Sequence, residues 1–147
     1  VQLNLSAKID GYSPAIGLPV FMGKAEGEKK EIVEFCQKMH NWTTENLKAG
    51  MKADIVPKKF LQMFKDAGYE KNYVYGPCHG TGMIEVEAPW METSTHYPLE
   101  KNMTFQIDTF ISGPTFGCRW EKGIAVKEGG FEMLSPEIPE ICPELHF

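Results

Sequence analysis

The sequence predicts an α+β fold, in which a mainly antiparallel sheet carries two helices on one face. Three features predict it. Extended runs with a hairpin turn open the chain, two stretches with a helical period follow, and short extended runs separated by turns fill most of the rest. The length of 147 residues fits one domain and is too short for two well-cored ones.

The first predicted element is a β-hairpin. Residues 1–9 alternate loosely between apolar and polar, and Asp10-Gly11 is a typical hairpin turn. Residues 12–21 predict the partner strand, whose two prolines favour a sheet edge or an irregular path.

Two helices follow the hairpin. From residue 28 the apolar positions recur every three or four residues, which predicts a helix over residues 28–48 that ends at Ala49-Gly50. Asp54 is the predicted N-cap of a second, shorter helix, and Gly68 ends that helix.

The second half of the chain is predicted to be rich in β-strands. The predicted strands cover residues 83–86, 103–111, 119–126 and 131–134. A glycine turn at 128–130 joins the last two. Three prolines within a short span predict that residues 136–147 form an irregular tail.

Composition excludes several classes of protein. Charged residues make up 24% of the chain and the formal net charge is -5, so no basic surplus is available for nucleic acid. No apolar run approaches the ~20 residues of a membrane helix, and residues 1–6 do not resemble a signal peptide. Because the chain does not begin with Met, we expect it to be a fragment or a processed product.

The cysteines indicate a reducing compartment. Cys36, Cys78, Cys118 and Cys142 stand apart, and none forms a CxxC pair of the kind found in zinc ribbons or thioredoxin-like sites. We expect four reduced, apolar side chains and a cytoplasmic protein.

Three residues of the second half are candidates for chemistry. His79 lies in a loop with two glycines, while Asp108 and Glu121 lie in predicted strands. One imidazole and two carboxylates suit a divalent ion such as Zn, Mn, Fe or Co. Spacing alone leaves simpler roles open, because His79 could hold its own loop and Arg119 could pair with Glu121 or Asp108. His40, His96 and His146 are predicted at the surface.

The order of four segments resembles a known family. Residues 76–83 (GPCHGTGM), 87–89 (EAP), 99–108 (LEKNMTFQID) and 117–121 (GCRWE) are similar to the C-terminal half of the pita-bread superfamily. That superfamily contains Xaa-Pro dipeptidases, aminopeptidase P, methionine aminopeptidases and creatinase. The resemblance spans roughly residues 3–135 and implies a curved sheet with both helices on its convex face.

The resemblance implies a dinuclear metallohydrolase site of two Asp, one His and two Glu, but here with degenerate ligands. His79 matches the His, and Asp108 and Glu121 fall on the two Glu positions. The two Asp positions fall on Asn4 and Ala15. We therefore expect at most one divalent ion (Mn, Zn, Co or Fe) on His79, Asp108 and Glu121, or none, and we expect these three side chains to converge.

The same resemblance assigns further roles. Glu87 matches a glutamate of the family's "VHE" segment, so His79 and Glu87 are the expected catalytic residues, and Arg119 is the expected substrate-binding residue. The histidine of that segment falls on Val86. Lys122 replaces an acidic residue, which we expect to add positive charge beside the site.

Asn and Ala at the two Asp positions also resemble creatinase, which hydrolyses creatine without a metal. A glutamate that creatinase carries shortly after its Ala falls on Gly17 here, so the likeness to that branch is partial.

Three functions follow from the resemblance. The first is an Xaa-Pro dipeptidase-like or creatinase-like hydrolase of C–N bonds in small peptides or amidines. The second is a catalytically inactive relative that binds peptide or protein, and the third is an intact dinuclear metallopeptidase.

The resemblance places residues 1–147 in the C-terminal part of one pita-bread domain. We expect an N-terminal segment, a partner chain or a homodimer to complete it, and neither nucleic acid nor membrane as a partner.

Overall fold

A computed structural model describes residues 1–136 and 142–145. Seven of the described strands form one sheet, in the order β1-β2-β7-β6-β4-β5, with β8 also paired to β7. Every pairing in this sheet is antiparallel. The strands of this sheet are β1 (Gln2–Ser6), β2 (Ala15–Pro19), β4 (Cys78–Gly80), β5 (Glu87–Met91), β6 (Thr104–Ser112), β7 (Gly117–Lys127) and β8 (Gly130–Met133).

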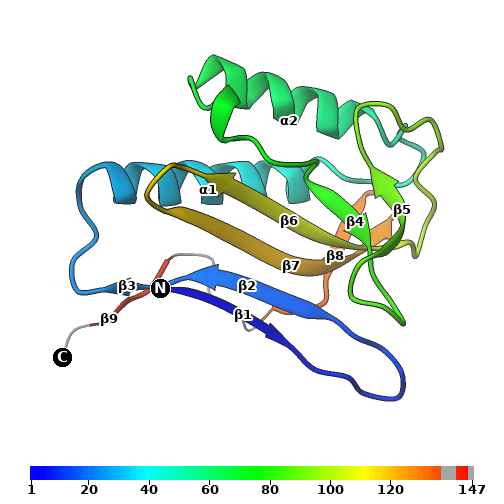
Figure 1. The fold of residues 1–147 in the computed structure, drawn as a ribbon. Coiled ribbons are helices and arrows are strands. Elements are labelled where there is room, and N and C mark those ends of the chain that lie inside the picture. The colour runs from blue at the N-terminus through cyan, green and yellow to red at the C-terminus, as the bar shows by residue number, and fades with distance from the viewer. Residues whose placement is uncertain (137–141, 146–147) are drawn as a thin grey trace.

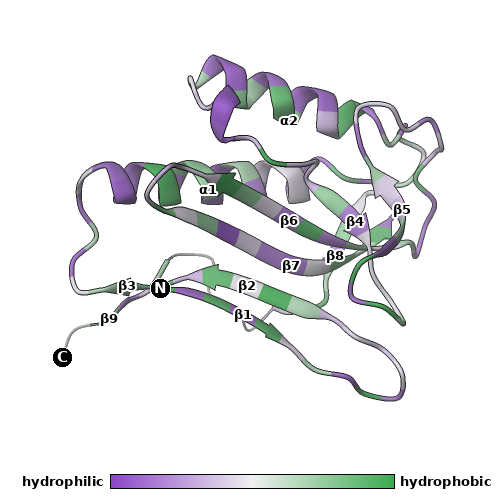
Figure 2. Ribbon diagram, viewed as in Figure 1, coloured by the Kyte–Doolittle hydropathy of each residue, from purple (hydrophilic) through white to green (hydrophobic). Residues whose placement is uncertain are grey.

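Two helices cover one face of this sheet, as the sequence predicts. The helix α1 (Gly27–Glu45) packs across β6 and β7, and α2 (Ile55–Asp66) lies beside it (Figure 1). The core between helices and sheet includes Phe60, Phe64 and Trp120, all fully buried. Figure 2 shows that β2 is largely hydrophobic, which agrees with the burial of four of its five residues. Neither helix has the apolar length to span a membrane.

The predicted hairpin is confirmed. Leu3 and Leu18 pair across β1 and β2, and Ile9 pairs with Tyr12 around the turn. Asp10 and Gly11 have φ angles of 51° and 90°. A two-residue hairpin turn of this kind needs positive φ at both central positions, and Asp-Gly is well suited to that geometry.

The helices end close to the predicted residues. The first helix ends three residues earlier than predicted, because Asn46 N–H already bonds back to Thr43 O. Gly68, with φ of 79°, follows the end of α2 as expected. Asp54 takes the N-cap position, but its carboxylate pairs with Lys58 at 2.5 Å instead of capping a backbone N–H.

The prediction of a strand at residues 83–86 is wrong. This segment bends, and the strands lie on either side of it as β4 and β5. A Cβ at Gly80 would lie 2.7 Å from the Ala88 carbonyl, so glycine permits the close approach of these two strands. Pro89 is accommodated because β5 is the last strand in the sheet order.

The tail is only partly irregular. Residues 144–145 form β9 (Glu144–Leu145), which pairs in parallel with β3 (Phe21–Met22). The rest of the predicted tail at 137–141 and 146–147, which includes His146, lies outside the described residues. The four cysteines are free thiols, as predicted.

His40 is not at the surface. The α1 face that packs on the sheet includes it, and only 2% of its surface is exposed. Its ring lies 6.3 Å from the Trp120 ring, centroid to centroid. Burial, with the nearby Lys122 charge as the second cause, lowers the pKa of His40 to about 3. His96 is exposed, as predicted.

The turn of the first hairpin predicts a matched pair of outcomes. Gly11→Ala should destabilise the protein by about 1 kcal/mol, because an L-residue is strained at positive φ. Gly129→Ala is the control, since Gly129 also lies in a hairpin turn, with no atom within 4 Å of an added Cβ and without a positive φ. Urea unfolding of both variants measures the difference. Equal losses at both positions would contradict the turn geometry.

His40 predicts a pH dependence of stability. Its pKa is lower in the folded protein than the ~6.5 of an unfolded chain, so the unfolded state binds the extra proton. Stability should therefore fall as pH drops below about 6.5, by up to about 1.4 kcal/mol per pH unit from this group. Urea unfolding between pH 7 and 5 should show a shallower fall for His40→Phe. His96→Phe is the exposed control and should keep the wild-type slope.

Candidate functional site

Three neighbouring strands bring the predicted site residues together. His79 lies on β4, Asp108 on β6 and Glu121 on β7, and Asp108 is directly opposite Glu121 in the ladder. One ligand atom from each residue lies within 4.8 Å of the others. The predicted convergence of these side chains is therefore confirmed.

The cluster lies on the sheet face that points away from the helices. Side chains alternate along a strand, and the neighbours Cys78, Ile107 and Trp120 point into the core under the helices. The cluster is nevertheless deeply buried, with side-chain exposures of 5% for His79, 3% for Asp108 and 1% for Glu121.

Arg119 connects the two carboxylates. It lies two residues before Glu121 and so shares its face of β7. Its Nε donates to Asp108 Oδ1 at 2.6 Å and its Nη2 to Asp108 Oδ2 at 2.9 Å. The same Nη2 lies 3.0 Å from Glu121 Oε2. Both pairings that the sequence left open are present at once, in the bidentate geometry typical of Arg and carboxylate.

Tyr75 is a site residue that sequence reasoning missed. Its hydroxyl donates to Asp108 Oδ2 at 2.6 Å. Burial, and then the Asp108 charge, raise the pKa of Tyr75, so it stays a donor. Asp108 therefore accepts three hydrogen bonds, two of them from Arg119. The only sequence signal was the position of Tyr75 directly before the Gly76-Pro77 segment.

His79 presents an unused lone pair to the carboxylates. Its Nδ1 lies 2.9 Å from Gly80 O. A carbonyl can only accept, so Nδ1 carries the proton and Nε2 is left as an acceptor. Among the described residues Nε2 has no hydrogen-bond partner. It lies 3.9 Å from both Asp108 Oδ2 and Glu121 Oε1.

The surroundings of Glu121 favour its protonated form. Burial, followed by repulsion from Asp108, raises the pKa of Glu121 to about 8, although the Arg119 charge opposes this shift. Its Oε1, the oxygen that faces His79, also lacks a hydrogen-bond partner within the described part of the chain. The His79 ring and a carboxyl group whose protonated form is favoured thus face each other.

The residues present do not fit a pair of metal ions. Ala15 has no ligand atom, and its carbonyl accepts from Gln106 Nε2 at 2.5 Å. Asn4 is on β1, opposite Gly17, and its Oδ1 accepts from Gln2 at 3.1 Å. Neither position offers the carboxylate that would bridge or chelate a second ion.

A single metal ion would have to compete with existing hydrogen bonds for its ligand atoms. Ligands about 2.1 Å from a tetrahedral zinc ion are roughly 3.4 Å apart, close to the 3.9 Å that separates His79 Nε2 from each carboxylate oxygen. Yet Asp108 Oδ2 already accepts from Tyr75 and Arg119. Of the ligand atoms in this cluster, His79 Nε2 and Glu121 Oε1 are the ones without a hydrogen-bond partner among the described residues, and two are fewer than a stable site needs.

The structure leaves the expected role of Glu87 untested and corrects the expected placement of Lys122. Glu87 accepts a hydrogen bond from Ile84 N–H at 2.9 Å, so its observed contact holds a loop, and its catalytic role stays a prediction. Lys122 does not lie beside the site, because it is on the helix face of β7, where its charge acts on His40. The expectation that Lys122 adds positive charge to the cluster is therefore wrong.

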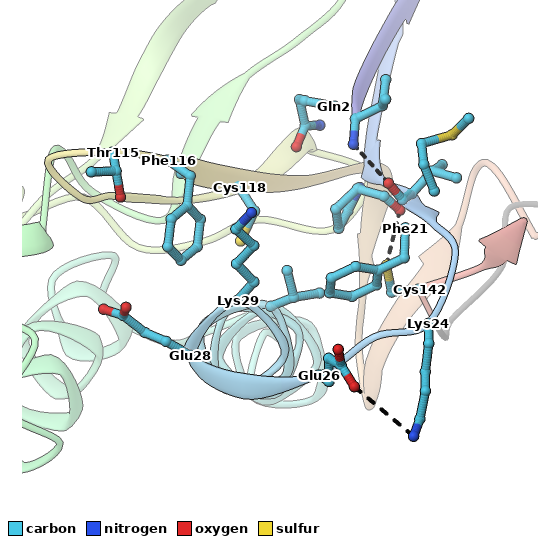
Figure 3. Close-up of a pocket in the computed structure, with 16 residues that line it drawn as sticks. Gln2, Phe21, Lys24, Glu26, Glu28, Lys29, Thr115, Phe116, Cys118 and Cys142 are labelled. Carbon is cyan, nitrogen blue, oxygen red and sulfur yellow. Dashed lines mark hydrogen bonds and ion pairs between the residues drawn. The ribbon is translucent and has the colours of Figure 1, made fainter.

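A separate groove lies elsewhere on the described part of the chain. It has a cavity volume of about 840 Å³ and lies between the first turn of α1, the strands β2 and β3, and the start of β7. Figure 3 shows Phe21, Phe116 and Cys118 lining it, with Lys24 and Glu26 paired at its rim. None of the three clustered residues lines this groove.

Comparisons with known proteins identify the family and agree with this fold. Residues 1–128 match the metallopeptidase family M24. An uncharacterized peptidase of Staphylococcus haemolyticus is 26% identical over 136 residues, which are 92% of this chain and 39% of that protein.

Solved structures show the same fold. The X-Pro aminopeptidase from Thermotoga maritima matches with a TM-score of 0.90 and 23% identity, over 98% of this chain and 40% of that one. The Xaa-Pro dipeptidase from Bacillus anthracis matches with a TM-score of 0.90 and 23% identity, over 98% of this chain and 41% of that one. The chain thus spans about two fifths of the length of these relatives.

The ion pairs of Arg119 with Asp108 and Glu121 allow a prediction for the loss of the Arg119 charge. Arg119→Met should destabilise the protein by about 3 kcal/mol at neutral pH, because two buried carboxyl groups lose their counter-charge. The loss should shrink as pH falls, since proton uptake by the cluster then replaces the missing counter-charge. Arg119→Lys, which keeps the charge but not the bidentate geometry, should lose less. Denaturant unfolding at pH 7 and 5 measures this, and equal losses at both pH values would contradict the assignment.

Proposed function

The chain belongs to metallopeptidase family M24, and we propose that it carries the acid–base residues of a hydrolase that cleaves a C–N bond in a small peptide or an amidine. One observation carries the proposal. The Nε2 of buried His79 faces Glu121 Oε1 at 3.9 Å, and neither atom has a hydrogen-bond partner among the described residues.

This arrangement supports hydrolysis without a metal pair. His79 Nε2 takes a proton from water, and the water oxygen bonds to the carbonyl or amidine carbon. Arg119 stabilises the negative charge that develops on that carbon's oxygen or nitrogen. Glu121 then donates its proton to the leaving nitrogen as the C–N bond breaks. The proton on His79 finally returns to Glu121, which restores the starting state.

The choice of substrates follows the relatives and the site. Two similar structures bear the names X-Pro aminopeptidase and Xaa-Pro dipeptidase, so dipeptides with proline in the second position are the first class to test. Amidines such as creatine are the second, because the site lacks both metal-bridging aspartates. The cluster is reached past Arg119, whose side chain is 23% exposed and is placed to contact a substrate carboxylate.

A second candidate function is peptide or protein binding without catalysis. Two observations favour it. The Arg119 guanidinium already forms ion pairs with Asp108 and Glu121, and the side chains of His79, Asp108 and Glu121 are deeply buried. In either case we propose that the domain is cytoplasmic and is completed by a further segment of the protein, a partner chain or a second copy.

The test uses the purified full-length protein. It should cleave one of the two substrate classes without added metal, and elemental analysis should find no more than one divalent ion per chain. His79→Ala should lower kcat at least 100-fold, since general base catalysis contributes about that much, whereas exposed His96→Ala should not change it.

Other outcomes would decide against this function. Two metal equivalents, with turnover near ~10 per second that depends on added Mn, Co or Zn, would show an intact dinuclear peptidase. No turnover of either class, with saturable peptide binding retained, would instead support the non-catalytic binding protein.

A further inference from the structure

A further carboxylate reaches the buried cluster from the loop between β4 and β5. The side chain of Glu85 is 37% exposed, and its Oε1 lies 4.0 Å from Arg119 Nη2. The same nitrogen lies 2.9 Å from Asp108 Oδ2 and 3.0 Å from Glu121 Oε2. These two shorter contacts match the two N–H groups that Nη2 carries. Glu85 is therefore the most exposed and most loosely held of three acidic groups around one guanidinium.

The loop backbone is ordered by a different glutamate. Ile84 N–H donates to Glu87 Oε2 at 2.9 Å, and a Cβ added at Gly82 would lie 2.7 Å from Glu87 Oε1. Ser13 N–H donates to Gly82 O at 2.8 Å and so fastens the loop to the first hairpin. Glu87 thus contacts the loop itself, and Glu85 is the carboxylate that this fastened loop presents to the cluster.

The mouth of the cluster carries more negative than positive charge. With Glu85 included, three carboxyl groups surround the single guanidinium of Arg119. Among these described residues the net charge is -2 when Glu121 is ionised and -1 when it is protonated, so it is negative in either state. Such a mouth attracts a positively charged group.

An unpartnered ring nitrogen indicates a ligand at the same place. The side chain of His79 is only 5% exposed, and its Nε2 lies 3.9 Å from both Asp108 Oδ2 and Glu121 Oε1. Among the described residues this nitrogen has no hydrogen-bond partner. Buried polar groups in folded proteins are nearly always hydrogen-bonded, so an exception of this kind calls for an explanation. A substrate group or its attacking water supplies one.

An exposed aromatic ring borders the cluster as well. Trp90 is directly opposite His79 in the β4–β5 ladder, so the two side chains share one face of the sheet. Their rings lie 5.9 Å apart, centroid to centroid, and Trp90 is 47% exposed. The face of an indole ring attracts organic cations. The aromatic ring and the surplus of carboxylates therefore favour the same kind of ligand.

We propose that Glu85 determines substrate specificity by binding a positively charged nitrogen group of the substrate. The inference rests on the proposed function. In a dipeptide this group is the α-ammonium of the amino end, and in a creatine-like compound it is the amidinium. The cation donates hydrogen bonds to the Glu85 carboxylate and lies near the Trp90 ring, while Arg119 contacts the substrate carboxylate. A peptide without the ammonium group loses this recognition.

Kinetics of the full-length protein test this role. The peptides Ala-Pro and propionyl-Pro differ only in the ammonium group. Glu85→Gln should lower kcat/KM for Ala-Pro by about 10-fold or more, the effect of losing a hydrogen bond between charged groups, and should leave propionyl-Pro unchanged. If creatine is the compound that is cleaved, its kcat/KM should fall by the same factor. Glu31→Gln, on an exposed glutamate of α1, is the matched control and should change neither value. Equal losses for both peptides, or no loss for the charged substrate, would overturn the proposal.

A binding measurement separates this inference from the proposed function. His79→Ala lacks the proposed base, so it should bind a substrate without cleaving it. Calorimetric titration of this variant in EDTA should show Ala-Pro binding about 10-fold more tightly than propionyl-Pro, and adding Glu85→Gln should abolish the difference. If the wild-type protein cleaves nothing but this preference is present, the hydrolase is wrong and the role of Glu85 stands. Equal affinities for the two peptides, a preference that EDTA removes, or binding of neither peptide nor creatine would overturn the role of Glu85.

Discussion

One guanidinium balances the charge at the centre of the sheet. Asp108 and Glu121 are directly opposite in the β6–β7 ladder, and two like charges in that position repel. Arg119 contacts both carboxylates from the same face, so the register of the two longest strands and the compensation of their charges depend on each other. A shift of one residue would send Arg119 and Glu121 to the helix face and leave Asp108 without its partner.

The same guanidinium supplies positive charge to both carboxylates from within the chain. Two carboxylates and one guanidinium leave a net charge of -1, and protonation of Glu121 brings the cluster to zero. Asn4 and Ala15 remove the two negative charges that would otherwise need cations. Part of the charge balance is therefore reached inside the protein, and His79 Nε2 has no hydrogen-bond partner among the described residues.

Local patterns predicted the hairpin, both helices and the long strands, because each depends on neighbouring residues. The convergence of His79, Asp108 and Glu121 was predicted only through the resemblance, since no spacing rule relates three separate strands. Three features escaped prediction because they depend on tertiary contacts: the Tyr75 hydrogen bond, the burial of His40, and the placement of β4 and β5. The sequence analysis wrongly expected Lys122 beside the site, although strand alternation puts it on the face opposite Glu121.

A hydrogen bond now joins the strands that the resemblance would join through metal. In that resemblance, an Asp at position 15 on β2 and an acidic ligand on β6 share the ions. Here Gln106 of β6 reaches across Gly123 of β7 and donates to the Ala15 carbonyl on β2. The bridge needs the glycine, since a Cβ at position 123 would lie 3.0 Å from Gln106 Oε1. The amide thus holds the two strands together at the level of the site.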